Sequence, residues 1–267
     1  MNTSSHCWLP IEDCEPANSP NMQLDGEPQY WLAQHMYVCP THDGVVLLDL
    51  RHDKYLGLGI TETRALAALV PGWSVHPDAP VLTDALPQSR CIEIAEHAYS
   101  EGVLVRDRDG GKSAAPVHLT DAATLIDLAH DGEHDGSIAP AHVWNFAASW
   151  VRAAWSLRFR SMEGAVREVE ERRALRQSDE RPFDCERAAE LTAVFRRIKP
   201  FFFTAEDRCL LHALALVNFL ARYDLYPRWV MGVKMRPFAA HSWVQYERFT
   251  LDSTPEEICS YTPILAV

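Results

Sequence analysis

Short apolar runs separated by turn residues open the structured part of the chain. Such runs predict short strands that pair with their neighbours. Asp43-Gly44 lies between the first two runs and is a typical hairpin signal. We therefore expect an antiparallel meander with strands at 35–39, 45–50 and 55–58.

The spacing of apolar residues then changes to that of amphipathic helices. The first helix is expected at 62–70 with Thr61 as its N-cap, and the second at 89–100. Residues 103–105 predict a short returning strand. The glycine-rich and charged segment 107–116 has the composition of a linker.

The second half of the chain is helical before it becomes strand-like. Apolar residues recur at helical spacing, and a further helix is expected to begin near Cys209. A helical layer followed by an antiparallel sheet predicts an α+β fold. The other expected helices are 140–159, 162–177 and 185–198, and the expected strands are 228–234, 241–246 and 249–251.

The length of 267 residues is sufficient for two modest domains. Residues 1–28 are rich in Pro, Asn, Ser and acidic residues, which is typical of a flexible arm. We expect one domain at 29–113 and a second at 119–267.

Composition excludes several function classes. A net charge of -12 argues against nucleic acid as a partner, because phosphate recognition needs a basic face. The sequence has no apolar run long enough for a membrane helix, and its start does not resemble a secretory signal. Seven scattered cysteines without a Cys-x-x-Cys pair favour a cytoplasmic protein with free thiols and no metal site.

Cys209, His241 and Asp252 lie on three consecutive expected elements. If 247–248 form a two-residue turn, strand alternation places Asp252 on the same face as His241, within side-chain reach. Thr204 is expected to cap the Cys209 helix, whose first turn would lower the pKa of the thiol. The alternative is that Cys209 is an ordinary buried cysteine under an apolar helix.

The three residue types suit nucleophilic catalysis. Cys209 would attack a carbonyl as thiolate, His241 would take and return the proton, and Asp252 would orient the imidazole. The Cys209 backbone N–H is a candidate oxyanion donor, with Arg208 or Gln245 as candidates for the second. A structural role is preferred for His212, which is one turn away from Cys209.

The runs 208–216, 231–234 and 237–244, the last containing Ala-His-Ser-Trp, resemble the protease half of lasso-peptide maturation B proteins. The resemblance covers about 119–267 and implies a transglutaminase-like, papain-related cysteine protease fold. It assigns the catalytic roles to Cys209, His241 and Asp252. The family often has Ser at the position of His212 and Glu at that of Gln245.

Residues 44–50, 55–58 and the following helix are similar to the leader-recognition domain of peptide-modifying systems, which is related to a small chaperone of quinone-cofactor synthesis (PqqD-like). The resemblance implies a winged-helix-like domain that binds a precursor leader as an added strand. Ordinary core packing is the alternative for its apolar residues. The implied leader-binding residues are Tyr55, Leu56, Leu58, Cys91, Ile94, Ala95 and Ala98.

Together the two resemblances imply a leader peptidase of lasso-peptide maturation. It would need no intrinsic cofactor, and its partners would be the precursor and an asparagine-synthetase-like cyclase that uses ATP. Two alternatives remain open: acyl transfer to an amine through a thioester, and leader binding without catalysis.

Overall fold

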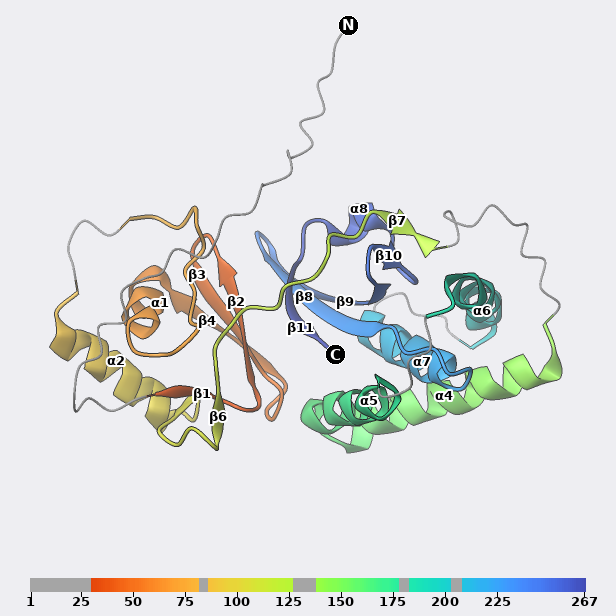
Figure 1. The fold of residues 1–267 in the computed structure, drawn as a ribbon, viewed down its shortest axis with the longest axis horizontal. Helices are drawn as coiled ribbons and strands as arrows, with labels where there is room; N and C mark the ends of the chain where they lie inside the picture. The colour runs from red at the N-terminus through yellow and green to blue at the C-terminus, as the bar shows by residue number, and fades with distance from the viewer. Residues whose placement is uncertain (1–29, 82–85, 127–137, 178–182, 203–207) are drawn as a thin grey trace, which may run out of the picture.

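The structure is a computed structural model that describes residues 30–81, 86–126, 138–177, 183–202 and 208–267. Two small sheets and two helices form the first part of the chain, and a larger sheet with several helices forms the last part (Figure 1). This mixed arrangement confirms the expected α+β class. The expected arm at 1–28 lies outside the described residues.

The meander is confirmed, with each strand within two residues of its expected bounds. It consists of β2 (Met36–Thr41), β3 (Gly44–Asp49) and β4 (Lys54–Gly59), in the order β2-β3-β4. Every residue of β3 is buried, because the sheet is covered on both faces. Val45 and Leu47 belong to the core of the first part, whereas Val46 and Leu48 join the core of the last part.

The face of the sheet that carries Val45 and Leu47 is covered by two helices, α1 (Ile60–Ala67) and α2 (Gln88–Ser100). The expected cap at Thr61 is wrong, because α1 begins at Ile60, two residues before the expected start, and Thr61 already lies inside it. Gly59 occupies the cap position and makes no side-chain hydrogen bond. The helix also ends at Ala67, and the chain continues from there as a turn.

The prediction of a linker at 107–116 is wrong, because two residues near the middle of this range form a strand. Residues Gly111–Lys112 form β6, which pairs with β1 (Trp31–Ala33) beside β5 (Leu104–Val105). A glycine-rich composition was a poor guide here, because Gly111 allows a close backbone approach: a Cβ there would lie 2.4 Å from Cβ of Trp31. The connection between the two parts of the chain is instead 113–123, which has no regular secondary structure (Figure 1).

Gly111→Ala is therefore expected to lower the free energy of unfolding by about 1–3 kcal/mol, because the new methyl group would overpack the site. Its nearest neighbours would be Cβ of Trp31 at 2.4 Å and Cγ2 of Val105 at 2.7 Å. Gly110→Ala is the matched control, since its nearest neighbour would be 3.8 Å away, an ordinary contact. Urea denaturation of the two variants checks this, and equal midpoints would contradict it.

The last part of the chain contains the four expected helices, and three of them have the expected bounds. The sheet beside them has the order β11-β8-β9-β10-β7, and its two outer strands and the short helix α8 were not expected from the sequence. The structure describes no helix that is both long and apolar enough to span a membrane. The elements are β7 (Thr124–Leu125), α4 (Pro140–Phe159), α5 (Met162–Gln177), α6 (Cys185–Ile198), η1 (Lys199–Phe201), α7 (Cys209–Ala221), β8 (Arg228–Met235), β9 (Phe238–Tyr246), β10 (Phe249–Thr250), α8 (Pro255–Ile258) and β11 (Thr262–Ala266).

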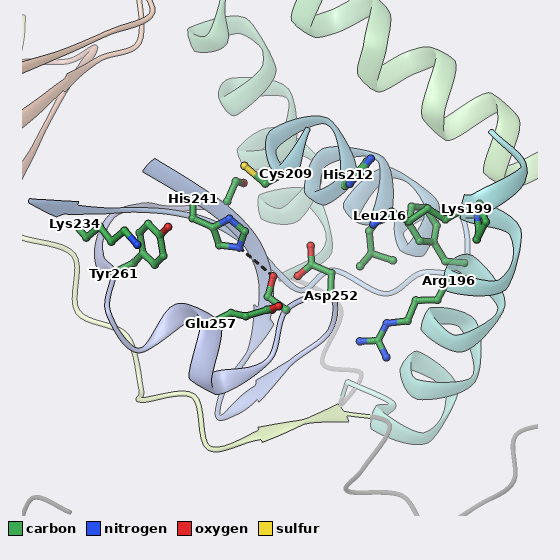
Figure 2. Close-up of a pocket in the computed structure, with 14 residues that line it drawn as sticks. Arg196, Lys199, Cys209, His212, Leu216, Lys234, His241, Asp252, Glu257 and Tyr261 are labelled. Atoms are coloured by element: carbon green, nitrogen blue, oxygen red, sulfur yellow. Dashed lines mark hydrogen bonds between the residues drawn. The ribbon is translucent and has the colours of Figure 1, made fainter. Parts of the chain in front are cut away.

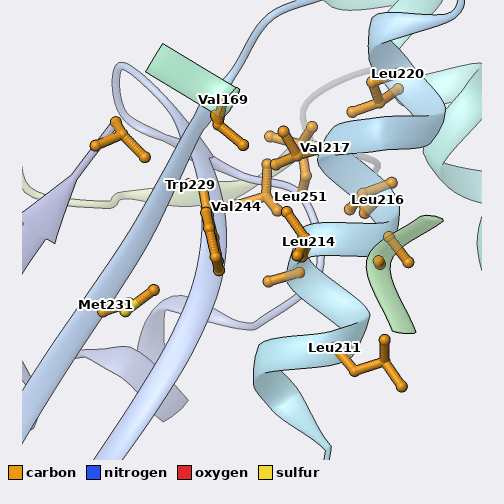
Figure 3. Close-up of a cluster of buried hydrophobic side chains, with 14 of the residues drawn as sticks. Val169, Leu211, Leu214, Leu216, Val217, Leu220, Trp229, Met231, Val244 and Leu251 are labelled. Carbon is orange, nitrogen blue, oxygen red and sulfur yellow. The ribbon is translucent and has the colours of Figure 1, made fainter. Parts of the chain in front are cut away.

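Helix α7 is the centre of this part of the molecule. All its residues from Leu211 to Leu220 are buried, because the sheet packs on one side and α4 on another. An almost wholly apolar helix is stable only in such surroundings. Figure 3 shows Leu214 and Val217 of α7 beside Trp229 and Val244 of the sheet. This packing fixes the position of the N-terminal end of α7, where Cys209 lies.

The sheet β2-β3-β4 also contacts the hairpin of β8 and β9. Arg236 in the hairpin turn pairs with the Asp43 carboxylate at 2.6 Å. The rings of Tyr55 on β4 and Phe238 on β9 meet edge to face, with centroids 5.6 Å apart. These contacts hold the end of β9 that leads to His241 against the first part of the chain.

Candidate active site

Cys209 is the first residue of α7 and is partly exposed, so the alternative of a wholly buried cysteine is wrong. Backbone N–H groups in the first turn of a helix have no partner within the helix and stabilise a nearby thiolate. Arg208 occupies the cap position and makes no side-chain cap hydrogen bond. The expected cap, Thr204, lies outside the described residues, and its assignment as the cap is wrong because α7 begins at Cys209 with Arg208 at the cap position.

His241 lies on β9, and its imidazole is held between two aromatic rings. Trp243 stacks at a centroid distance of 6.1 Å, and Tyr261 lies at 5.4 Å. Gly232 faces His241 across the sheet, and a Cβ there would lie 2.7 Å from the Trp243 ring. Burial is the main cause that lowers the pKa of His241, so the ring is neutral at pH 7 and can accept a proton.

Asp252 follows β10, and the expected register of the hairpin is confirmed. Phe249 pairs with Tyr246 and Thr250 with Gln245 across a two-residue turn. The chain then leaves the sheet, and the Asp252 carboxylate accepts a hydrogen bond from the Val244 N–H at 2.8 Å. This short strand directs Asp252 to the side of the sheet where His241 lies.

The hydrogen bond of His241 goes to Ser253, which no pattern in the sequence predicted. Nε2 of His241 and Oγ of Ser253 are 3.2 Å apart (Figure 2). Within the described part of the chain, no hydrogen bond joins His241 to Asp252. The only signal in the sequence was that Ser253 follows Asp252, which placed it near the ring without predicting the contact.

Cys209, His241 and Asp252 line one pocket of about 830 Å³ (Figure 2). Ser253 and His212 also line it, and burial lowers the pKa of His212 to about 4, so that this imidazole is neutral. His212 therefore lines the pocket and is also buried within the packing around α7. The charged residues of the lining are Arg196, Lys199, Lys234, Asp252 and Glu257.

Gln245 does not fit the role of an oxyanion donor. Its side-chain nitrogen donates to the backbone carbonyls of Thr120 and Glu247, both at 2.7 Å. Its side-chain oxygen accepts from the Trp243 indole at 3.0 Å. The amide thus joins the sheet to the connecting segment, and it does not line the pocket. The Arg208 side chain is exposed at the start of α7.

Residues 150–266 match the family described as the transglutaminase-like superfamily. This part of the chain is therefore similar to transglutaminase-like domains. The match includes Cys209, His241 and Asp252, and members of this superfamily are typically cysteine-dependent enzymes. No curated protein and no solved structure gave a significant match to the chain.

The pocket combines one thiol, two imidazoles and several charged groups with apolar side chains such as Phe195 and Leu216. Among the residues that the structure describes, no group of three or more His, Cys, Asp or Glu side chains is arranged to hold a metal ion. The pocket brings the Cys209 thiol and the His241 imidazole together, and this geometry supports thiol chemistry.

The residues expected to bind a leader occupy different surroundings. Leu56 on β4 has 38% of its surface exposed, and Cys91 on α2 is partly exposed. Ala95 is fully buried in the core of the first part, so it lies behind any surface that a peptide could contact. Leu58, Ile94 and Ala98 are partly buried against the same core.

Tyr55 faces the last part of the chain instead. It packs against the core of that part and against Phe238. Its pKa is raised to about 12, chiefly by burial and further by the negative charges of Asp53 and Cys209. Tyr55 thus joins the edge strand β4 to the neighbourhood of the candidate nucleophile.

Asp252 gives the fold a dependence on pH. Burial raises its pKa from 3.8 to about 6, although the Val244 N–H and Arg196 act in the opposite direction. Between these two values the folded protein binds a proton that the unfolded chain has released, so stability falls as the pH rises. Asp252→Asn is expected to remove this part of the decline.

Urea midpoints measured from pH 4 to pH 7 check the prediction. Asp121→Asn is the control, because Asp121 is exposed and should leave the pH dependence of wild type unchanged. If Asp252→Asn and wild type decline in parallel over the whole range, Asp252 does not hold the proton that we assign to it.

Proposed function

We propose that the protein is a leader peptidase of lasso-peptide maturation, and that it cleaves the amide bond between leader and core. The observation that carries the proposal is the shared pocket in which Cys209, at a helix N-terminus, lies beside the neutral imidazole of His241. The match to the transglutaminase-like superfamily supports cysteine chemistry at this pocket.

The reaction begins when the Cys209 thiol transfers its proton to His241 and the thiolate attacks the scissile carbonyl. The Cys209 backbone N–H is positioned to stabilise the oxyanion, as is usual for a nucleophile at a helix start. His241 returns the proton to the leaving amine, which is the new N-terminus of the core. Water then resolves the thioester and releases the leader.

The edge strand β4 is the proposed site of leader binding. Its outer edge has no partner strand in the described part of the chain, and an unpaired edge can accept a peptide as an added strand. Tyr55 and Leu56 lie on this strand, and Tyr55 contacts the hairpin that carries His241. A peptide held along β4 would therefore lie close to the pocket.

The corresponding domain boundaries are 29–113 for leader recognition, with a winged-helix-like fold, and 119–267 for the protease. The proposed partners are the precursor and an asparagine-synthetase-like cyclase. That cyclase would use ATP to join the freed amine to an acidic side chain.

Acyl transfer to an amine is the second candidate, because the transglutaminase-like superfamily and the same three residues suit both outcomes. The two are separated by incubating the protein with a candidate precursor, encoded by a short frame next to the gene, with and without a primary amine. Mass spectrometry should find free leader and free core in both samples. An amine adduct that replaces free leader would favour acyl transfer, and intact precursor in both samples would contradict the proposal.

A further inference from the structure

We propose that Ser253 is a positioning residue for the cysteine chemistry: its hydroxyl holds His241 so that the ring nitrogen Nδ1 is free to take the Cys209 proton. The inference rests on the proposed function, because it assigns His241 the role of base. It adds a residue that neither the superfamily match nor the sequence pattern identifies.

The first support is the geometry around the ring. Trp243 and Tyr261 contact the imidazole, but aromatic contacts alone do not distinguish the two ring orientations that are related by rotation about the Cβ–Cγ bond. The 3.2 Å contact from Nε2 to Oγ of Ser253 fixes this rotation. Ser253 is itself 7% exposed, so its position is set by packing and not by solvent.

The second support is the place of Asp252. One oxygen of its carboxylate is bound by the Val244 N–H, which ties the residue to the edge of β9. Ser253 is therefore the residue of this turn that forms a hydrogen bond with the ring in the described structure. Asp252 contributes its negative charge nearby, whereas Ser253 contributes the directional contact.

The third support is the balance of protons in the reaction. With Ser253 accepting from Nε2–H, the neutral ring has its lone pair on Nδ1. The proton of Cys209 moves to Nδ1, which leaves a thiolate and an imidazolium that donates from both nitrogens. A hydrogen bond from a charged donor is stronger, so Ser253 stabilises the ion pair more than the neutral pair. When Nδ1 gives the proton to the leaving amine, the neutral ring is restored and Cys209 is left as a thioester. Nδ1 then takes a proton from the water that attacks the thioester and returns it to the sulfur, which restores the starting thiol.

The test follows the alkylation of Cys209 by iodoacetamide as a function of pH, with mass spectrometry of the peptide that contains it. Exposed Cys259 is the internal reference in the same sample. In Ser253→Ala, the rise in Cys209 reactivity is expected to move to higher pH by about one unit, with an about tenfold lower rate near neutral pH. Ser253→Thr, which keeps the hydroxyl, is expected to retain the wild-type profile.

Ser260→Ala is the matched control, because Ser260 is exposed in the same segment of the chain. A Ser253→Ala profile equal to that of wild type would overturn the inference. So would slower cleavage together with a lower melting temperature and an unchanged profile, because that result describes a structural role only. Ser253→Gly repeats the test if the alanine variant does not fold.

Failure of the proposed function would give a different result. In that case, Cys209 of the wild-type protein would follow the same profile as Cys259, and no Ser253 variant would change it. Loss of the Ser253 effect alone, with Cys209 still more reactive than Cys259, would leave the proposed nucleophile in place.

Discussion

Cys209→Ala is expected to reduce leader removal by at least about 10³-fold, because alanine cannot form the thioester. The residue lies at the start of α7 on the wall of the pocket, and its side chain makes no structural hydrogen bond in the described part of the chain. The variant should therefore fold normally and still bind the precursor. Mass spectrometry of the precursor after incubation measures the loss.

The matched control is Cys259→Ala, which removes an exposed thiol outside the pocket and should keep wild-type activity. Binding of the precursor to Cys209→Ala, measured by fluorescence anisotropy, separates lost chemistry from lost recognition. If Cys209→Ala still releases leader in the presence of the cyclase, the assignment of the nucleophile is wrong. If wild type and the variant are equally inactive and both bind the precursor, the protein is a leader-binding protein without catalysis.

Trp229→Ala is expected to lower the free energy of unfolding by about 3–5 kcal/mol, the usual cost of removing a large aromatic side chain from a core. Trp229 is fully buried between α7 and the sheet (Figure 3). Its indole N–H also donates to the hydroxyl of Ser242 at 2.8 Å, so the substitution leaves that buried hydroxyl without one of its partners. Urea denaturation measures the change.

Trp144→Ala is the matched control, because the same side chain on α4 is 73% exposed. It should change the unfolding free energy by less than about 0.5 kcal/mol, as most surface substitutions do. Similar losses in the two variants would contradict the assignment of Trp229 to the centre of the core. Because Ser242 neighbours His241 on β9, the Trp229 variant should also reduce the reactivity of Cys209 before it unfolds.

The helices of the last part show how far the sequence pattern can be trusted. The ranges 140–159 and 185–198 agree with α4 and α6, because long amphipathic stretches have a clear apolar periodicity. The charged range 162–177, for which a broken pair of helices was the alternative, is the single helix α5 although its apolar periodicity is weak. The missed strands β1, β6, β7 and β11 have two to five residues each. Strands this short show almost no periodic pattern of apolar residues. They form because they pair with strands that are distant in the sequence.

In the candidate site, too, some features follow from the local sequence and others from the tertiary structure. The sequence by itself indicated that Cys209 lies near a helix start and allowed a two-residue turn at 247–248 that puts Asp252 on the His241 side of the sheet, because each depends on local geometry. Only the tertiary structure decided that Cys209 opens onto a pocket, that Ser253 contacts His241 and that Tyr55 lies at the junction with β9. These contacts join residues from separate elements, and their distances depend on how the buried side chains pack, which no local pattern specifies.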